Sequence, residues 1–190
     1  VAALRQIWRL SRMEFVFALI AMLGPIGLGV LNGVIIAIAA TLVYLLRKIM
    51  FPRDAMLGRI PGRDGFYKLH RTLEASQVPG LAVCLIQGSL LFFNTDHVET
   101  RLRSIVDGLP AETRWLLIDA SAIPQIDSSA ATMLLHLCAE FRDRGIRLGL
   151  AEVHAEAREL LHRAGVIECM GSAMVFDILE DAYQAFEATA

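Results

Sequence analysis

The hydrophobic pattern is dominated by one stretch near the start of the chain. From Phe15 to Leu46 there are 32 residues without a charged side chain. A single helix of that length would be about 48 Å long, whereas the hydrocarbon core of a bilayer is about 30 Å thick. The pair Asn32-Gly33 is typical of a turn. We therefore expect a membrane hairpin of two short helices, Phe15–Leu31 and Val34–Leu46, about 25 and 20 Å long.

Charge supports this interpretation of the apolar stretch. Residues 1–53 carry six basic side chains and one acidic side chain, whereas residues 54–190 carry twelve basic and nineteen acidic ones. Basic flanks on both sides of the stretch place both of its ends in the cytoplasm, which requires an even number of crossings. The alternative is a pair of buried core helices in a soluble protein, but neither segment has the polar face that such helices show.

After residue 50 the pattern becomes that of an aqueous domain. Residues 51–65 are rich in proline, glycine and charged side chains, so we expect a basic linker there. Apolar runs of strand length then alternate with segments of helical period. The predicted strands are Leu81–Ile86, Leu90–Phe93, Trp115–Ile118, Arg147–Val153 and Met174–Phe176, and the predicted helices are one that begins at Asn94, Ser128–Arg142, Ala155–Ala164 and Ile178–Glu187.

This alternation predicts the fold class and the domains. Strands separated by helices favour an α/β domain with a mostly parallel sheet covered by helices. The first two predicted strands are joined by the tight turn Gln87-Gly88-Ser89, so that pair would be antiparallel and the sheet mixed. We predict a membrane helical hairpin at 1–50, a linker at 51–65 and a folded cytosolic domain at 66–190.

The segment Asp127-Ser128-Ser129 is the most suggestive piece of chemistry in the sequence. It follows a buried strand that ends at Asp119 and opens a predicted helix. Either Asp127 or Ser128 could accept hydrogen bonds from the free amides of the first helical turn. A helix start behind the carboxyl end of a strand also favours anions. The segment therefore indicates either a plain helix cap or a regulatory site that is phosphorylated or binds phosphate.

The remaining candidate chemistry gives no support for an enzyme, a metal site or a cofactor. Cys84, Cys138 and Cys169 are odd in number, lie in apolar surroundings and have no metal-site spacing, so we expect buried, reduced thiols. The histidines have no ligand spacing either. Neither a glycine-rich phosphate loop nor a nucleophile elbow is found.

Two segments, GSLLFFNTDHVETRLRSIV and RWLLIDASAIPQIDSSAATMLLHL, resemble a STAS domain, the module shared by sulfate transporters and anti-sigma-factor antagonists. The upstream FPRDAMLGRIPGRDGFYKLHR and the apolar hairpin resemble the end of the SulP anion permeases. The resemblance implies a C-terminal fragment that holds the last two membrane segments and the STAS domain. It places the anion site on membrane segments outside this chain, so we name no substrate-binding residue.

The resemblance also implies a function and partners. The expected function is that of a secondary active transporter of an inorganic anion or dicarboxylate (sulfate, bicarbonate or a dicarboxylate) in the cell inner membrane, with residues 51–190 in the cytoplasm. The expected partners are the lipid bilayer, the rest of the transporter domain, a second copy in a homodimer, and a cytosolic regulatory protein or a nucleotide, but no nucleic acid.

The alternative function is a membrane-tethered switch of the anti-sigma-antagonist type. The phosphorylated serine of those antagonists would fall on Ser129. Ala130 stands where they usually have glycine.

Overall fold

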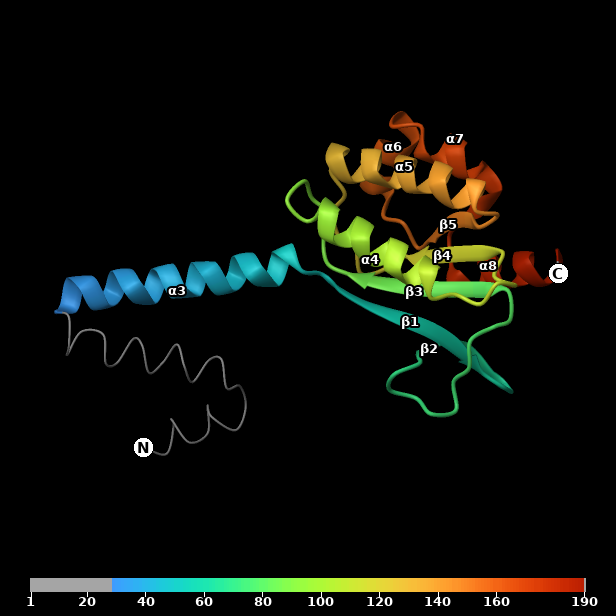
Figure 1. Cartoon of the computed structure of the whole chain (residues 1–190), viewed down its shortest axis with the longest axis horizontal. Helices are drawn as coiled ribbons and strands as arrows, with labels where there is room; N and C mark the ends of the chain where they lie inside the picture. Colours follow the sequence, from blue (N-terminus) through green and yellow to red (C-terminus); the bar gives the residue numbers. More distant parts are fainter. Residues whose placement is uncertain (1–28, 190) are drawn as a thin grey trace. The chain divides into compact units, whose positions relative to one another are not determined.

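The computed structural model describes residues 29–189 of the chain. It divides into two compact units, Val1–Ile49 and Met50–Ala190. The described part of the first unit is one helix, and the second unit is a mixed sheet with helices (Figure 1).

Helix α3 (Val30–Met50) is long and apolar enough to cross a membrane by its length and composition. Its 21 residues span about 31 Å. Most of its large apolar side chains are exposed, and the Thr41 hydroxyl donates back to the Ala37 carbonyl oxygen at 2.8 Å. The Thr41 hydroxyl therefore has its hydrogen-bond partner inside the helix, which is how a polar group is satisfied where no water is available.

The helix corrects one expectation of the sequence. The predicted helix break at Asn32-Gly33 is wrong, because α3 runs through both residues. The helix is also longer than the expected Val34–Leu46. The left-handed residue is Gly29, with φ of +80°, just before the helix starts. The other expected helix, Phe15–Leu31, lies outside the described residues except for its last three.

The second unit contains a six-stranded sheet in the order β2-β1-β3-β4-β5-β6. Strand β1 is antiparallel to both of its neighbours, and the other pairs are parallel. The predicted α/β class with a mixed, mostly parallel sheet is therefore confirmed. The strands are β1 (Arg53–Ile60), β2 (Arg63–Lys68), β3 (Leu81–Gln87), β4 (Trp115–Asp119), β5 (Arg147–Ala151) and β6 (Val175–Phe176).

Two sequence-based predictions about the sheet are wrong. The expected linker at 51–65 forms β1 and the start of β2, with Pro61-Gly62 as the turn between them. The expected strand Leu90–Phe93 contributes a single bridge between Leu90 and Ile126, and the residues after it form turns. The antiparallel neighbour of β3 is therefore β1, which comes before it in the chain.

The helices cover both faces of the sheet. Asp54 in β1 pairs with Arg101 on α4, whereas Leu57 lies beside Leu179 on α8. Because residues three apart in a strand point to opposite faces, α4 and α8 lie on opposite sides. Helices α4 to α7 stack above the sheet in Figure 1. Their bounds are α4 (Thr95–Asp107), α5 (Ser128–Asp143), α6 (Ala155–Arg163), α7 (Val166–Met170) and α8 (Leu179–Glu187).

Helix α7 was not expected from the sequence. Gly165 has φ of +76°, which ends the predicted Ala155–Ala164 helix and starts a new short one. The core lies between the sheet and these helices. Strands β3 and β4 are almost wholly buried, as their continuous apolar runs predict for parallel strands covered on both faces.

Candidate functional site

The candidate site lies where β4 ends and α5 begins. Asp119, the last residue of β4, is buried, and its Oδ1 accepts the backbone N–H of Ser121 at 2.9 Å. That bond tightens the turn through which the chain leaves the sheet. The bridge between Leu90 and Ile126 then holds the two loops of this edge together.

Asp127 is the N-cap of α5 and also binds a second loop. Its Oδ1 accepts the backbone N–H of Ala130 at 2.9 Å, and its Oδ2 accepts the backbone N–H of Phe92 at 2.6 Å. The backbone N–H of Asp127 donates in turn to the Leu90 carbonyl oxygen at 3.0 Å. Of the two capping residues left open by the sequence, the structure therefore selects Asp127.

Ser128 and Ser129 occupy the first two positions of α5 and are exposed, whereas the next two residues, Ala130 and Ala131, are fully buried. The Ser128 carbonyl oxygen accepts the Thr132 hydroxyl at 3.0 Å. An exposed hydroxyl at a helix start can be reached by a kinase, and the helix dipole favours added negative charge there. The Asp127 carboxylate opposes added negative charge on either serine, because it already accepts a backbone N–H at the amino end of the helix.

The sequence missed the loop that Asp127 holds. Phe92 and Phe93 were predicted as strand residues but lie on a turn, where they are 70% and 37% exposed. The buried Asn94 fixes this turn, since its Oδ1 accepts from the Leu91 backbone N–H and its Nδ2 donates to the Ser89 carbonyl oxygen, both at 2.9 Å. The signal in the sequence was the polar Asn94-Thr95-Asp96 immediately after two aromatics, which is typical of a turn into a helix.

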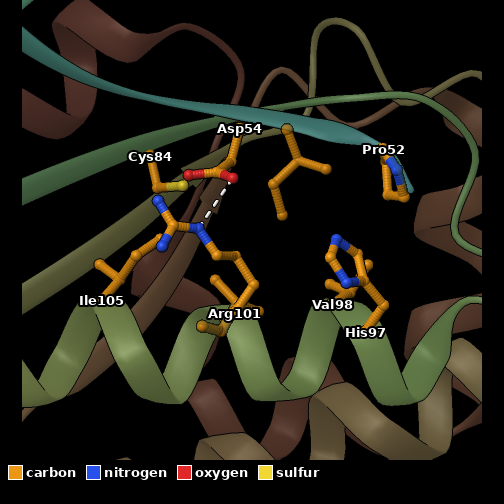
Figure 2. Close-up of a pocket in the computed structure, with 9 residues that line it drawn as sticks. Pro52, Asp54, Cys84, His97, Val98, Arg101 and Ile105 are labelled. Carbon is orange, nitrogen blue, oxygen red and sulfur yellow. Dashed lines mark hydrogen bonds and ion pairs between the residues drawn. The ribbon is translucent and has the colours of Figure 1, made fainter.

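A small pocket lies between α4 and strands β1 and β3 (Figure 2). Arg101 enters it from α4 and donates through Nε to Asp54 Oδ1 at 2.9 Å. This hydrogen bond raises the pKa of Arg101, so the guanidinium stays charged. The free volume is about 10 Å³, which is room for about one water molecule. The pocket is therefore part of the packing under α4 and is too small for an organic ligand.

The buried thiols of Cys84 and Cys138 are poor nucleophiles in this arrangement. Burial, with a smaller effect of the Asp54 carboxylate, raises the pKa of Cys84 to about 12. Burial and a contact with Cys169 raise the pKa of Cys138 to about 12 as well. Within residues 29–189, no three His, Cys, Asp or Glu side chains gather into a group that could hold a metal ion.

A family model described as the STAS domain matches residues 72–182. A probable sulfate transporter of Mycobacterium tuberculosis is 33% identical over 182 residues, which are 96% of this chain and 32% of that protein. High affinity sulfate transporter 1 of Stylosanthes hamata is 27% identical and aligns with 98% of this chain and 29% of its own length. The chain thus spans about a third of the length of these relatives.

Two solved structures have the same fold. The murine Slc26a9 anion transporter in its inward-facing state matches 97% of this chain and 30% of its own, with a TM-score of 0.84 and 19% identity. A sulfate transporter family protein from Wolinella succinogenes matches 63% of this chain and 96% of its own, with a TM-score of 0.52 and 24% identity. The STAS match covers more than half of the chain and the sulfate-transporter relatives align with nearly all of it, so the chain belongs to the SulP family and carries its STAS domain.

Proposed function

We propose that the chain is the C-terminal part of a secondary active transporter of an inorganic anion or dicarboxylate, with sulfate, bicarbonate and a dicarboxylate as the candidate substrates. One observation carries the proposal. An apolar, exposed helix of membrane-spanning length is joined within two residues to a STAS domain, and sulfate transporters align across both. The anion-binding residues would lie in the parts of the relatives that this chain does not cover.

In this proposal residues 1–50 belong to the membrane part of the transporter, and the STAS domain begins at β1. The division of the chain near residue 50 supports this boundary. Residues 51–190 would be cytoplasmic in the cell inner membrane. The basic Arg47 and Lys48 in the last turn of α3 support that orientation, because basic residues favour the cytoplasmic side.

The STAS domain would regulate transport and contribute to a homodimer. Its regulatory surface would include the exposed Ser128 and Ser129 beside the Asp127 cap, where a cytosolic protein or a nucleotide could bind. The second candidate function is a membrane-tethered switch of the anti-sigma-antagonist type. The exposed Ser129 hydroxyl at a helix start is the observation that favours it.

The test is uptake of labelled sulfate, bicarbonate and succinate by vesicles that hold the full-length protein. We expect saturable uptake of at least one anion, competed by the same unlabelled anion. A matched preparation without residues 53–190 separates transport from its regulation. If none of the three anions enters faster than into protein-free vesicles, the transporter proposal is wrong, and binding of a partner by phosphorylated and unphosphorylated Ser129 becomes the test of the switch.

A further inference from the structure

We propose that the turn Leu91–Phe93 of the STAS domain rests in the headgroup region of the bilayer, next to the point where the chain leaves the membrane. Phe92 and Phe93 would be the side chains in contact with lipid. The inference rests on the proposed membrane location of α3. Beyond the proposed function, it states that the STAS domain itself contacts lipid.

The two aromatic side chains are unusually placed for a domain in water. They are adjacent, 70% and 37% exposed, and their rings meet edge to face with centroids 5.2 Å apart. A single exposed apolar side chain is common on protein surfaces. Two neighbouring phenylalanines on one turn form a continuous apolar tip, and such tips mark contact surfaces.

Covalent connections bring this tip close to the membrane exit. Phe51 follows the last residue of α3, and its ring centre lies 4.9 Å from that of His97 in the first turns of α4. Phe93 is only four residues before His97, so its backbone lies within about 15 Å of that contact. On the other strand, Arg53 pairs with Gln87, and a Cβ on Gly88 would be 3.2 Å from Pro52.

The same placement is visible in the fold of the second unit. Helices α4 and α5 both begin at the end of the sheet where β1 starts (Figure 1). One end of the sheet therefore holds the amino ends of both helices, the turn Leu91–Phe93 and the start of β1 after residue 50.

The turn is held rigidly in its exposed position. The Phe92 backbone N–H donates to Asp127 Oδ2 at 2.6 Å, and the Phe92 carbonyl oxygen accepts the Thr95 hydroxyl at 3.1 Å. The Leu91 backbone N–H donates to Asn94 Oδ1 at 2.9 Å. Because the backbone is already ordered, little conformational entropy is lost when the two rings enter a bilayer interface.

The chemistry of this edge fits a lipid surface. Aromatic and large apolar side chains prefer the boundary between headgroups and acyl chains. Arg47 and Lys48 lie in the last turn of α3, and the exposed Arg53 follows, so basic groups lie on the chain where it leaves the proposed membrane helix. Asp127 does not oppose this, since its two carboxylate oxygens are used by backbone N–H groups.

The experiment places a nitroxide label on the full 190-residue chain in phosphatidylcholine–phosphatidylglycerol vesicles. Cys169→Ser removes the half-exposed thiol, and the buried Cys84 and Cys138 stay in place. Labels go to Phe92→Cys and, separately, Phe93→Cys. Leu73→Cys is the matched control, because Leu73 is a fully exposed apolar residue in the loop between β2 and β3. Ile38→Cys in α3 reports on the membrane helix.

We expect the labels at Phe92 and Phe93 to collide several-fold more with lipid-soluble oxygen, relative to a water-soluble nickel complex, than the label at Leu73. Lipids carrying nitroxide or bromine on the upper acyl chain should quench a fluorophore at Phe92 and not one at Leu73. If the label at Phe92 is as aqueous as that at Leu73 while Ile38 reports lipid, the inference is overturned and the membrane helix stands.

Two other outcomes are informative. If the label at Phe92 is shielded from oxygen, from nickel and from lipid quenchers, another protein surface covers the turn and the lipid contact is overturned. If Ile38 is also aqueous, the proposed membrane function itself fails. The labels at Phe92 and Ile38 thus test the lipid contact of the turn and the membrane location of α3 separately.

Discussion

The guanidinium carbon of Arg59 lies 4.0 Å from the ring centre of Tyr183, and its Nη1 donates to Glu180 Oε2 at 2.6 Å. The ring of Phe66 lies 5.4 Å from the same guanidinium. One side chain of β1 thus joins an aromatic residue of β2 to two residues of α8. The Glu180 hydrogen bond raises the pKa of Arg59, so this charge is fixed under all working conditions.

We predict that Arg59→Met lowers the free energy of unfolding of the STAS domain by about 1–3 kcal/mol. The substitution keeps apolar contact but removes a partly desolvated cation–π contact and a charge-assisted hydrogen bond. Urea denaturation followed by the fluorescence of Trp115 measures it. Arg63→Met is the control, because Arg63 is exposed at the start of β2. Equal effects of the two substitutions would show that the Arg59 contacts contribute nothing specific.

A second prediction concerns the cap of α5. Asp127→Ala should cost about 0.5–2 kcal/mol of stability, because the Ala130 and Phe92 backbone N–H groups both lose their acceptor. Asp127→Asn should cost less, since asparagine is also a good N-cap. Ser128→Ala should leave the stability within about 0.5 kcal/mol of the parent, as for an ordinary surface substitution. A larger loss from Ser128→Ala than from Asp127→Ala would contradict the observed cap.

A third prediction uses a close approach inside the sheet. A Cβ on Gly149 would lie 2.7 Å from Leu117 Cδ2 and 2.8 Å from the Met174 carbonyl oxygen. Gly149→Ala should therefore destabilise the domain by about 1–3 kcal/mol through overpacking. Gly108→Ala is the matched control, since its Cβ meets nothing closer than 3.5 Å. The test is the midpoint of thermal unfolding of each variant. A midpoint for Gly149→Ala at or above that of Gly108→Ala would refute the steric argument.

The helices and the buried strands could be predicted because their signals are local. Strand β4 is a continuous apolar run, and α5 repeats its buried residues at helical spacing. The β1–β2 hairpin was missed for a physical reason. Charged residues in it find partners far away in the chain, as Asp54 does with Arg101, so the segment looks like a solvated linker until the sheet is assembled.

The candidate site was predictable in part for the same reason. That Asp127 could cap α5 follows from a few consecutive residues. Its hold on Phe92 crosses 35 residues of sequence, and no periodicity encodes it. Leu90–Phe93 satisfied the composition of a strand, but the buried side chain of Asn94 bonds the backbone of the turn instead. Tertiary hydrogen bonds thus overrode a local apolar signal.

A fourth prediction follows from the pKa of about 12 at Cys84 and Cys138. At pH 8 only about one thiol in ten thousand would be ionised at such a site, and the thiolate is the reactive form. Iodoacetamide at pH 8 should modify the half-exposed Cys169 in the folded chain and leave the other two unmodified. Mass spectrometry of the digested protein reads each site. Denaturant should bring the three to equal modification, and rapid labelling of Cys84 before denaturation would show that β3 is not packed as described.

The last prediction concerns Ser129, whose regulatory role remains a proposal. A phosphate there adds about −1.5 to −2 charges beside the Asp127 carboxylate. The amides at the start of α5 favour that charge, but repulsion would weaken the bond from Asp127 to the Phe92 backbone N–H. Phosphorylation of Ser129 would then loosen the turn Leu91–Phe93. The transport rate would change through this turn, which is not part of the anion site.

We therefore expect Ser129→Glu to change the uptake rate of the full-length transporter at constant membrane abundance. Ser129→Ala should transport like the unmodified parent and should not respond to kinase treatment. Ser104→Glu adds the same charge at an exposed position of α4, and it should have no effect. Asp127→Ala tests the same turn independently, because it removes the acceptor of the Phe92 N–H without adding negative charge. It should shift uptake in the same direction as Ser129→Glu. Parent-like uptake in both would reduce the motif to a helix cap, whose only consequence is the stability measured in the second prediction.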